Sequence, residues 1–220
     1  NTQTTQKSLP IYRGELALLL AVSINSFGVV LMLYSGTGIS AISSVPYAFP
    51  GLSEDKPWNM DLHISGTSGT GADDPAEKFV VQYLFSFVVG FVFGELLDVH
   101  ELWINVLPTA IGWRIFYFIA SYILICIGIA ISNRCKMPIV PTDLFPRELS
   151  QITSVAYPKI KISFDVICLI ITAALTGFGL GHIKGLGIGT VVAAFTMGKG
   201  VGIAGNWLDK HMDFTSFLAK

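Results

Sequence analysis

The chain has 220 residues, of which 52% are hydrophobic and only 13% are charged. The charged share is about half of that in a soluble globular domain, so the composition argues against a soluble enzyme and requires lipid to cover apolar surface. The net charge of −1 argues against nucleic acid as a partner, because phosphate binding needs a concentrated basic face. We therefore expect an all-α, polytopic integral membrane helix bundle that forms one domain over 1–220.

Five stretches are apolar enough to cross the bilayer core, which needs about 20 apolar residues in a helix. They run over residues 16–34, 79–97, 111–132, 162–180 and 186–207. A signal peptide is the rival interpretation of the first stretch. Its apolar run is too long for one, however, and no small-residue cleavage site follows it.

Residues 53–78, between the first two spans, have a different character. They hold six acidic residues, two lysines and a run of Gly, Ser and Thr. Small polar residues of this kind are typical of flexible linkers, so we expect this insert to lie in water.

The distribution of Lys and Arg predicts the orientation. With five spans, nine of these residues fall on the side that carries 35–78, 133–161 and 208–220, and three or four fall on the other. Because cytoplasmic loops carry the excess of positive charge, we expect 133–161 and the C-terminus in the cytoplasm, with the protein in the cell inner (plasma) membrane.

Sliding the chain against itself indicates an internal repeat at an offset of 100 residues, with halves of about 16–107 and 111–210. The matches are Gly28 with Gly128, Ile39 with Ile139 and Pro46 with Pro146. In both halves an apolar helix precedes a stretch rich in Gly, Pro, Ser or Thr. Paired interruptions of this kind favour a transporter, with a site at the interface of its halves. The alternative is that both stretches are ordinary interfacial loops.

Four motifs together carry a family resemblance. They are Ile-Asn-Ser-Phe-Gly at 24–28, Ile-Ser-Ser-Val-Pro-Tyr at 42–47, Pro-Thr-Asp-Leu-Phe-Pro-Arg-Glu-Leu at 141–149 and Gly-Leu-Gly-Ile-Gly-Thr at 185–190. In this combination the chain resembles the YczE/YitT-like family of bacterial inner-membrane proteins over 16–50 and 79–210. The resemblance implies six spans in two three-helix halves, with both termini cytoplasmic. It implies hardly any chemistry, since that family is largely uncharacterised.

The chain departs from this family pattern at 53–78, where the family has a second apolar helix. One span is therefore absent or replaced. An odd number of spans puts the N-terminus outside, whereas Lys7 and Arg13 argue weakly for inside. Three alternatives remain open: an altered topology, a segment 38–52 that re-enters the membrane, or a foreign insert at 53–78.

Small residues recur at spacing four in the predicted spans, which lets helix backbones approach closely. The candidates for helix packing are Gly90, Gly94, Gly185, Gly189, Gly198 and Gly202. We interpret them as packing positions within the chain. A homodimer face or a docking face for a partner membrane subunit is the alternative.

Ionisable residues inside spans are costly and mark functional sites. Lys199 lies deep in the last span and could pair with Glu95, Asp98 or Asp165, although its long stem also allows it to reach the headgroups. A helical pair with Lys161 at the membrane boundary explains Asp165 nearly as well.

Three further residues are candidates for a solute pathway. Asp143 and Arg147 offer a carboxylate and a guanidinium beside the second broken stretch. The alternative for these two is a capped interfacial helix that starts at Thr142 or Asp143. Asn25 is an amide deep in the first span, where a hydrogen bond between helices is its expected role.

The sequence offers no catalytic set and no sign of a cofactor. The four histidines lack metal-ligand spacing, and the three cysteines lack the pairing of a disulfide framework. We therefore expect a small transporter or permease-like protein for an unidentified small solute. The alternatives are a substrate-binding membrane subunit of a larger transport complex and a non-transporting membrane regulatory or scaffold protein.

Overall fold

The computed structural model describes residues 11–38, 76–135, 137, 139–180 and 186–215. In this part the chain forms six helices and two short strands. They are β1 (Ile11–Arg13), α1 (Gly14–Tyr34), α4 (Ala76–Ile104), α5 (Ile111–Ser132), α6 (Pro141–Thr153), α7 (Tyr157–Leu180), α8 (Ile188–His211) and β2 (Asp213–Thr215). The predicted all-α fold is confirmed.

Among the described residues, four helices are long and apolar enough to cross a membrane. They are α1, α5, residues Tyr157–Gly177 of α7, and α8. The prediction of a multi-pass helical membrane protein is therefore confirmed. The expected span 79–97 falls within α4, a helix of 29 residues whose side chains at 76–84 lie outside the described part. The predicted insert at 53–78 lies outside it as well, apart from the first turn of α4.

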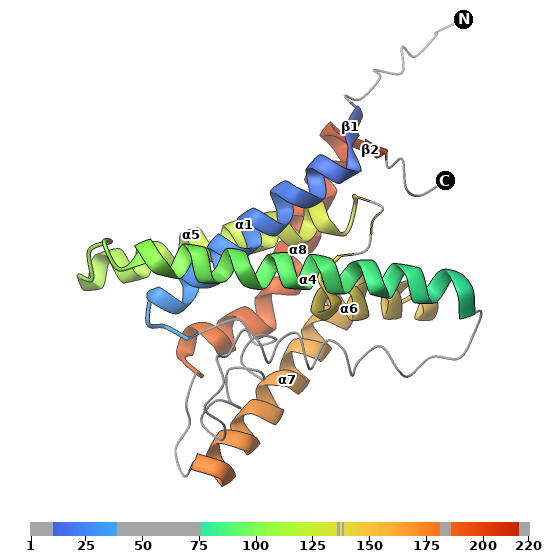
Figure 1. The fold of residues 1–220 in the computed structure, drawn as a ribbon. Coiled ribbons are helices and arrows are strands. Elements are labelled where there is room, and N and C mark those ends of the chain that lie inside the picture. The colour runs from blue at the N-terminus through green and yellow to red at the C-terminus, as the bar shows by residue number, and fades with distance from the viewer. Residues whose placement is uncertain (1–10, 39–75, 136, 138, 181–185, 216–220) are drawn as a thin grey trace, which may run out of the picture.

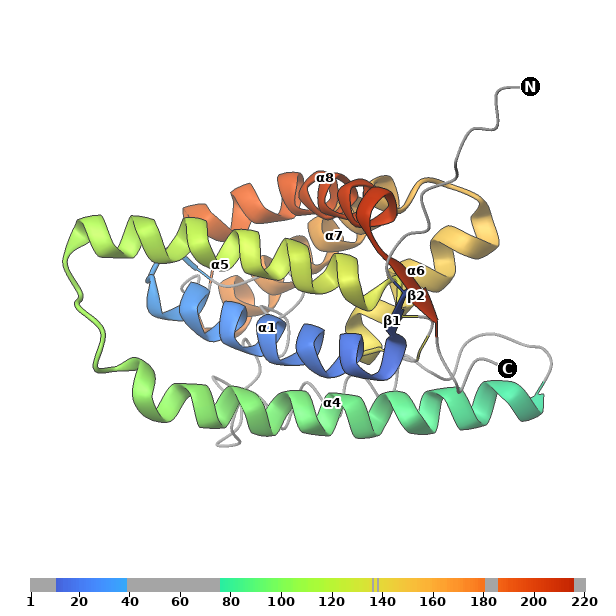
Figure 2. The ribbon, with the colours of Figure 1, turned by 90° about the horizontal axis from the view of Figure 1, so that it is seen from above.

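The centre of the bundle is the packing of α1 against α5. Figure 2 shows α1 between α4 and α5, with α8 on the far side of α5. The backbones of α1 and α5 approach closely because glycine lies at their contact. A Cβ at Gly28 would come within 2.8 Å of Ile125, and one at Gly128 would collide with Asn25.

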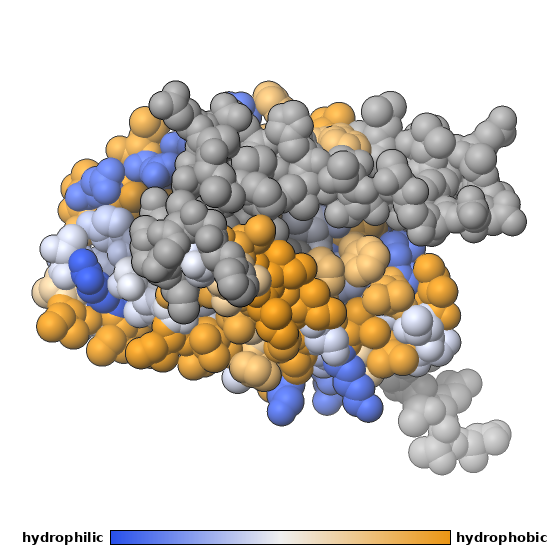
Figure 3. All heavy atoms as spheres, turned by 90° about the horizontal axis from the view of Figure 1, so that it is seen from below, coloured by the Kyte–Doolittle hydropathy of each residue, from blue (hydrophilic) through white to orange (hydrophobic). Residues whose placement is uncertain are grey.

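The outer surface of the bundle is largely apolar, as lipid contact requires. Large exposed hydrophobic side chains occur on every long helix. Examples are Leu16, Phe91, Phe116, Ile171 and Phe195. Figure 3 shows side chains of this kind as broad hydrophobic patches on one face. Contiguous apolar surface of this extent is unusual on a soluble monomer.

α1 and α4 run in the same direction. Near their C-terminal ends, Phe27 stacks on Trp103 and the Tyr34 hydroxyl donates a 2.6 Å hydrogen bond to the Leu107 carbonyl. Because α1 and α4 run parallel, Gly38 lies where α4 ends and Ala76 lies at the opposite end of the bundle.

The two ends of the described chain lie together. Strands β1 and β2 pair in parallel, with Ile11 opposite Asp213, and both lie at one end of the bundle (Figure 1). The sequence left the side of the N-terminus open. This pairing puts residues 11–13 on the same side as residues 213–215.

Candidate functional site

A buried lysine forms the centre of a charged cluster. Lys161 lies in the second turn of α7, and its Nζ is 2.9 Å from Asp165 Oδ1 and 3.7 Å from Asp143 Oδ1. The side chains are 1% exposed for Lys161, 3% for Asp165 and 14% for Asp143. We call these three residues the Lys161 cluster. Transfer of a charge out of water costs several kcal/mol unless it is paired, so both carboxylates have a physical role here.

The Lys161 cluster lies level with the middle of α8. Gly198, near the midpoint of that helix, is so close to α7 that a Cβ there would come within 2.7 Å of the Pro158 carbonyl and 2.9 Å of Ile162. Lys161 lies between these two positions in the sequence. Lys161 and Asp165 form the helical pair that the sequence analysis gave as an alternative explanation of Asp165. The pair lies deep in the bundle, however, and not at its boundary.

Asp143 reaches the cluster from the first turn of α6. This helix begins at Pro141, and its N-cap residue, Val140, makes no side-chain hydrogen bond to the helix start. The expectation that Thr142 or Asp143 caps the helix is therefore wrong, because the Asp143 carboxylate turns toward Lys161. Burial raises the pKa of the Asp143 carboxyl above its usual range, against the opposing effect of Lys161 and Arg147.

A cavity of about 440 Å³ lies beside the Lys161 cluster. It opens between the end of α5, the helix α6, the start of α7 and the second half of α8. Its polar lining includes Asn133, Arg134, Arg147, Gln151, Tyr157 and Asn206. Tyr157 is one turn before Lys161 on α7, and Arg147 is one turn after Asp143 on α6, so the cavity and the cluster share two helix faces.

Three residues that line the cavity each carry a buried polar atom without a hydrogen-bond partner among the described residues: Asn133 Oδ1, Arg147 Nε and Tyr157 Oη. Asn133 lies near the Tyr157 hydroxyl, yet no hydrogen bond of ordinary geometry joins the two. The other nitrogens of Arg147 are engaged, Nη1 with the Met137 carbonyl at 3.0 Å and Nη2 with Glu148 at 3.3 Å. A buried donor or acceptor without a partner costs about 1–3 kcal/mol, so a group of three indicates a place where a ligand or water binds.

The structure separates the remaining predicted residues from this site. Lys199 is exposed on α8 and makes no ion pair within the described part of the chain. Asp165 pairs with Lys161 instead. Asn25 is buried against Gly128, and its Oδ1 accepts no hydrogen bond there, so the expected bond between helices is not seen at that atom.

The predicted packing glycines divide into two groups. Gly198 and Gly202 bring α8 against Pro158 at the start of α7, and Gly189 lies against Phe118. At these three positions the close neighbours belong to the same chain. A Cβ at Gly94 would meet no atom within 4 Å among the described residues, so no packing role is seen for it, and Gly185 lies outside the described part.

The sequence interpretation missed Lys161 as the centre of the site, along with Tyr157 and Asn133. The sequence feature that could have revealed the site is the spacing of four residues, which places Tyr157, Lys161 and Asp165 on one helix face. The site also differs from the expected place, because its residues all come from the second half of the chain and not from the interface between halves.

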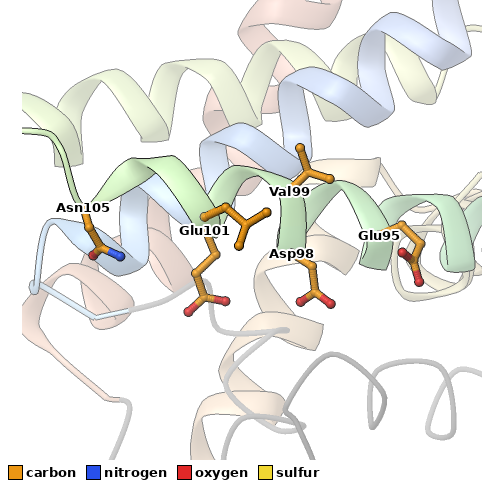
Figure 4. Close-up of a pocket in the computed structure, with 6 residues that line it drawn as sticks. Glu95, Asp98, Val99, Glu101 and Asn105 are labelled. Atoms are coloured by element: carbon orange, nitrogen blue, oxygen red, sulfur yellow. The ribbon is translucent and has the colours of Figure 1, made fainter.

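A second polar hollow lies along α4, where the side chains of Glu95, Asp98 and Glu101 project to the same side (Figure 4). Its volume is about 480 Å³. No group of three potential ligands that could hold a metal ion occurs within the described ranges, and Asp98 and Glu101 already have interactions. We therefore do not assign it a function.

Comparisons with known proteins identify a family. A model described as a family of unknown function (DUF6198) matches residues 76–206, from the first residue of α4 to the last turns of α8. No curated protein and no solved structure matches the chain. The resemblance to the YczE/YitT-like family stays a prediction. Because the family model covers more than half of the sequence and includes the entire Lys161 cluster, the chain belongs to this family of unknown function, DUF6198.

Proposed function

We propose that this protein is a small membrane transporter, and that its solute interacts with the Lys161 cluster and the adjacent cavity. The observation that carries the proposal is an ion-paired lysine, 1% exposed, level with the middle of an apolar helix long enough to span a bilayer. Charged groups at such a depth are expensive, and they typically mark substrate or ion pathways.

The proposed internal repeat adds support, because contacts exchange under the offset of 100 residues. Gly28 packs against Ile125, and Gly128 packs against Asn25, so each contact maps onto the other when 100 is added to one residue and subtracted from the other. Such reciprocal contacts are the property of a two-fold interface. Since α1 and α5 run in opposite directions, the corresponding axis lies across the helices, as in transporters with inverted repeats.

The segments that follow α1 and α5 make corresponding contacts, displaced by two to three residues from the exact offset. The side chains of Ser35 and Cys135 both donate to the carbonyl three residues earlier. The Thr37 carbonyl then accepts a hydrogen bond from the backbone of Gly189 on α8, whereas the Ile139 carbonyl accepts one from the Ser86 hydroxyl on α4. Each segment thus docks on a helix of the other proposed half.

We also propose that both termini face the cytoplasm of the inner membrane. The paired strands β1 and β2 lie at the same end of the bundle as α6, and Arg134, which follows α5 and pairs with Asp209 near the end of α8, lies near this end. The positive-inside rule then favours a cytoplasmic location for this end of the bundle. Reporters fused before residue 1 and after residue 220 are expected to be active only in the cytoplasm. Activity of one fusion outside the cell would contradict this orientation.

Transport is tested by finding a solute and following its movement. The purified full chain is first screened for thermal stabilisation by pools of metabolites, because a ligand that binds only the native state raises its stability. Uptake of each stabilising compound into proteoliposomes is then measured. We expect saturable uptake by the wild type and a strongly reduced maximal rate of uptake by Asp143→Asn. This variant leaves the pair of Lys161 and Asp165 intact, and a solute that it holds more tightly is released more slowly.

Lys199→Gln is the matched control, because that side chain is exposed and distant from the cluster in sequence and contacts. It is expected to transport like the wild type. Equal uptake by Asp143→Asn and the wild type would reject the proposed site. Co-purification with an ATPase, together with uptake only in its presence, would instead favour the alternative of a substrate-binding membrane subunit.

A further inference from the structure

We infer that the cavity beside the Lys161 cluster binds a small organic or inorganic anion through a carboxylate or phosphate group. This inference rests on the proposed function, because it names the class of the transported solute. The lining of the cavity contains two guanidinium groups, from Arg134 and Arg147, and no carboxylate. Its volume of about 440 Å³ is at the small end of the range for ligand pockets.

Arg147 is positioned to donate to such an anion. Its Nη1 and Nη2 are held by the Met137 carbonyl and by Glu148, which fixes the plane of the guanidinium and leaves the buried Nε without a partner. The Glu148 carboxylate is 39% exposed, so solvent screens its charge and weakens its ion pair with Arg147. A charged donor fixed in this way is well suited to carboxylate or phosphate oxygens.

Tyr157 supplies a second donor from the facing helix. Its buried hydroxyl has no partner among the described residues. An anionic oxygen between α6 and α7 could accept from this hydroxyl and from Arg147 Nε, whereas a cation would leave the Nε donor of Arg147 without a partner. Asn133 Oδ1, the third atom without a partner, is an acceptor and suits an anion that also carries a hydroxyl or an acidic proton.

Arg134 contributes positive potential to the cavity but hardly any free donor, because its nitrogens are already engaged. Its Nε and Nη2 bind both oxygens of Asp209 at 2.5 and 2.6 Å, and its Nη1 donates to the Ala130 carbonyl at 3.2 Å. Gly205 lies directly beneath this guanidinium, where any Cβ would collide with it. The wall formed by the ends of α5 and α8 is therefore fixed before a ligand arrives, which reduces the entropy lost on binding.

The test measures binding of defined anions to the purified full-length protein at constant ionic strength. The probes are inorganic phosphate, which represents phosphate groups, and citrate, which represents carboxylates. Tetramethylammonium chloride is the control for a cation and for added salt. We expect a saturable rise in melting temperature with phosphate or with citrate and none with the control. Stabilisation by neither anion, or by the control cation, would overturn the inference.

Two variants test the assigned donors. Arg147→Gln is expected to weaken the binding of the effective anion by about tenfold or more, the loss of one charge-assisted hydrogen bond. Tyr157→Phe removes one oxygen atom only and keeps the fold, so it serves if Arg147→Gln does not fold. We expect Tyr157→Phe to bind the effective anion with a measurably larger Kd than the wild type. Unchanged affinity in a folded variant of either kind would overturn the assignment, and Lys199→Gln should bind like the wild type.

The outcomes separate this inference from the transport proposal. Saturable anion binding without uptake into proteoliposomes would reject transport and retain the anion site. Uptake of a neutral or cationic solute without any anion binding would reject the anion site and retain transport.

Discussion

The least expected residue of this protein is Lys161. A lysine whose side chain is 1% exposed in an apolar bundle persists only because Asp165 and Asp143 both face it. The two carboxylates are not equivalent, since Asp165 is the closer partner at 2.9 Å and also the more buried of the two. Their different positions suggest different roles, with Asp165 holding the lysine in place and Asp143 facing the side of the cavity.

Stability measurements can distinguish these roles. Asp165→Asn is expected to lower the free energy of unfolding by about 3 kcal/mol or more, because it leaves a buried charge without its main partner. Asp143→Asn should lower the free energy of unfolding by clearly less than Asp165→Asn does. Unfolding of the detergent-solubilised protein in mixed micelles with SDS measures both values. The double variant Lys161→Met with Asp165→Asn should recover part of the loss, and equal effects of the two single variants would contradict the assignment.

The Asp143 carboxyl also predicts a pH dependence. The charged and titratable groups around it are Arg147 and Glu148 from α6 and Tyr157, Lys161 and Asp165 from α7. Burial raises its pKa, so Asp143 takes up a proton in a range where exposed aspartates remain ionised. When the pH falls through this raised pKa the local negative charge decreases, and an anion in the cavity should bind more tightly.

Sulfate is a suitable probe for this effect, because its own charge is constant over the mildly acidic range. The affinity of the wild type for sulfate is expected to rise as the pH is lowered, as measured by calorimetric titration. Asp143→Asn, which is always neutral at this position, should bind sulfate with the tighter affinity and little pH dependence. The same pH dependence in this variant would assign the proton to another group.

At the scale of helices, the contact of α1 with α5 depends on glycine. Gly128→Ala is expected to destabilise the protein by roughly 1–3 kcal/mol, since a methyl group in a tightly packed contact forces neighbouring atoms to move. Asn25 is the neighbour that it meets. Gly94→Ala is the matched control, because open space surrounds that position within the described part. Equal melting temperatures of the two variants would show that the helices do not pack in this way.

The helices were largely predictable because each is a long apolar run. The expected span 111–132 coincides with α5, and 16–34 differs from α1 only at its start. The start of α7 was placed five residues late, at 162 and not at Tyr157. The reason is physical: Lys159 and Lys161 end the apolar run in the sequence, whereas in the fold Lys161 is buried by Asp143 from a different helix.

The candidate site was predictable only in part. Asp143, Arg147 and Asp165 were selected because charge near or within a span is costly, and the structure brings the first and third of these to one lysine. Lys199 was selected by the same rule, yet it faces outward. Sequence alone gives the depth of a residue along its own helix but not the direction its side chain faces, which depends on the rotation and tilt set by packing.

For the whole molecule, the informative contact is the pairing of β1 with β2. It joins the two ends of the described chain at one end of the bundle. The proposed halves are opposite in orientation, since α1 and α5 start from opposite ends of the bundle.

Opposed halves predict two docking contacts that work against each other. If transport alternates access between the two sides, the segment after α1 stays docked on α8 in one state, and the segment after α5 stays docked on α4 in the other. Cys135 reports on the second contact, because it is fully buried in that segment and burial raises the pKa of its thiol, which slows alkylation. Ser86→Ala removes the hydroxyl that holds Ile139, so it is expected to increase the alkylation rate of Cys135 several-fold.

The experiment uses a background in which Cys126 and Cys168 are replaced by serine, so that Cys135 is the remaining thiol among the three cysteines of the chain. Gly189→Ala is the counterpart variant, because its methyl group would meet Thr37 and loosen the first contact. It should leave Cys135 as protected as in the wild type or more so. An equal increase in both variants would indicate general loosening of the bundle and would contradict alternation, whereas opposite responses are specific to two contacts that exchange between states.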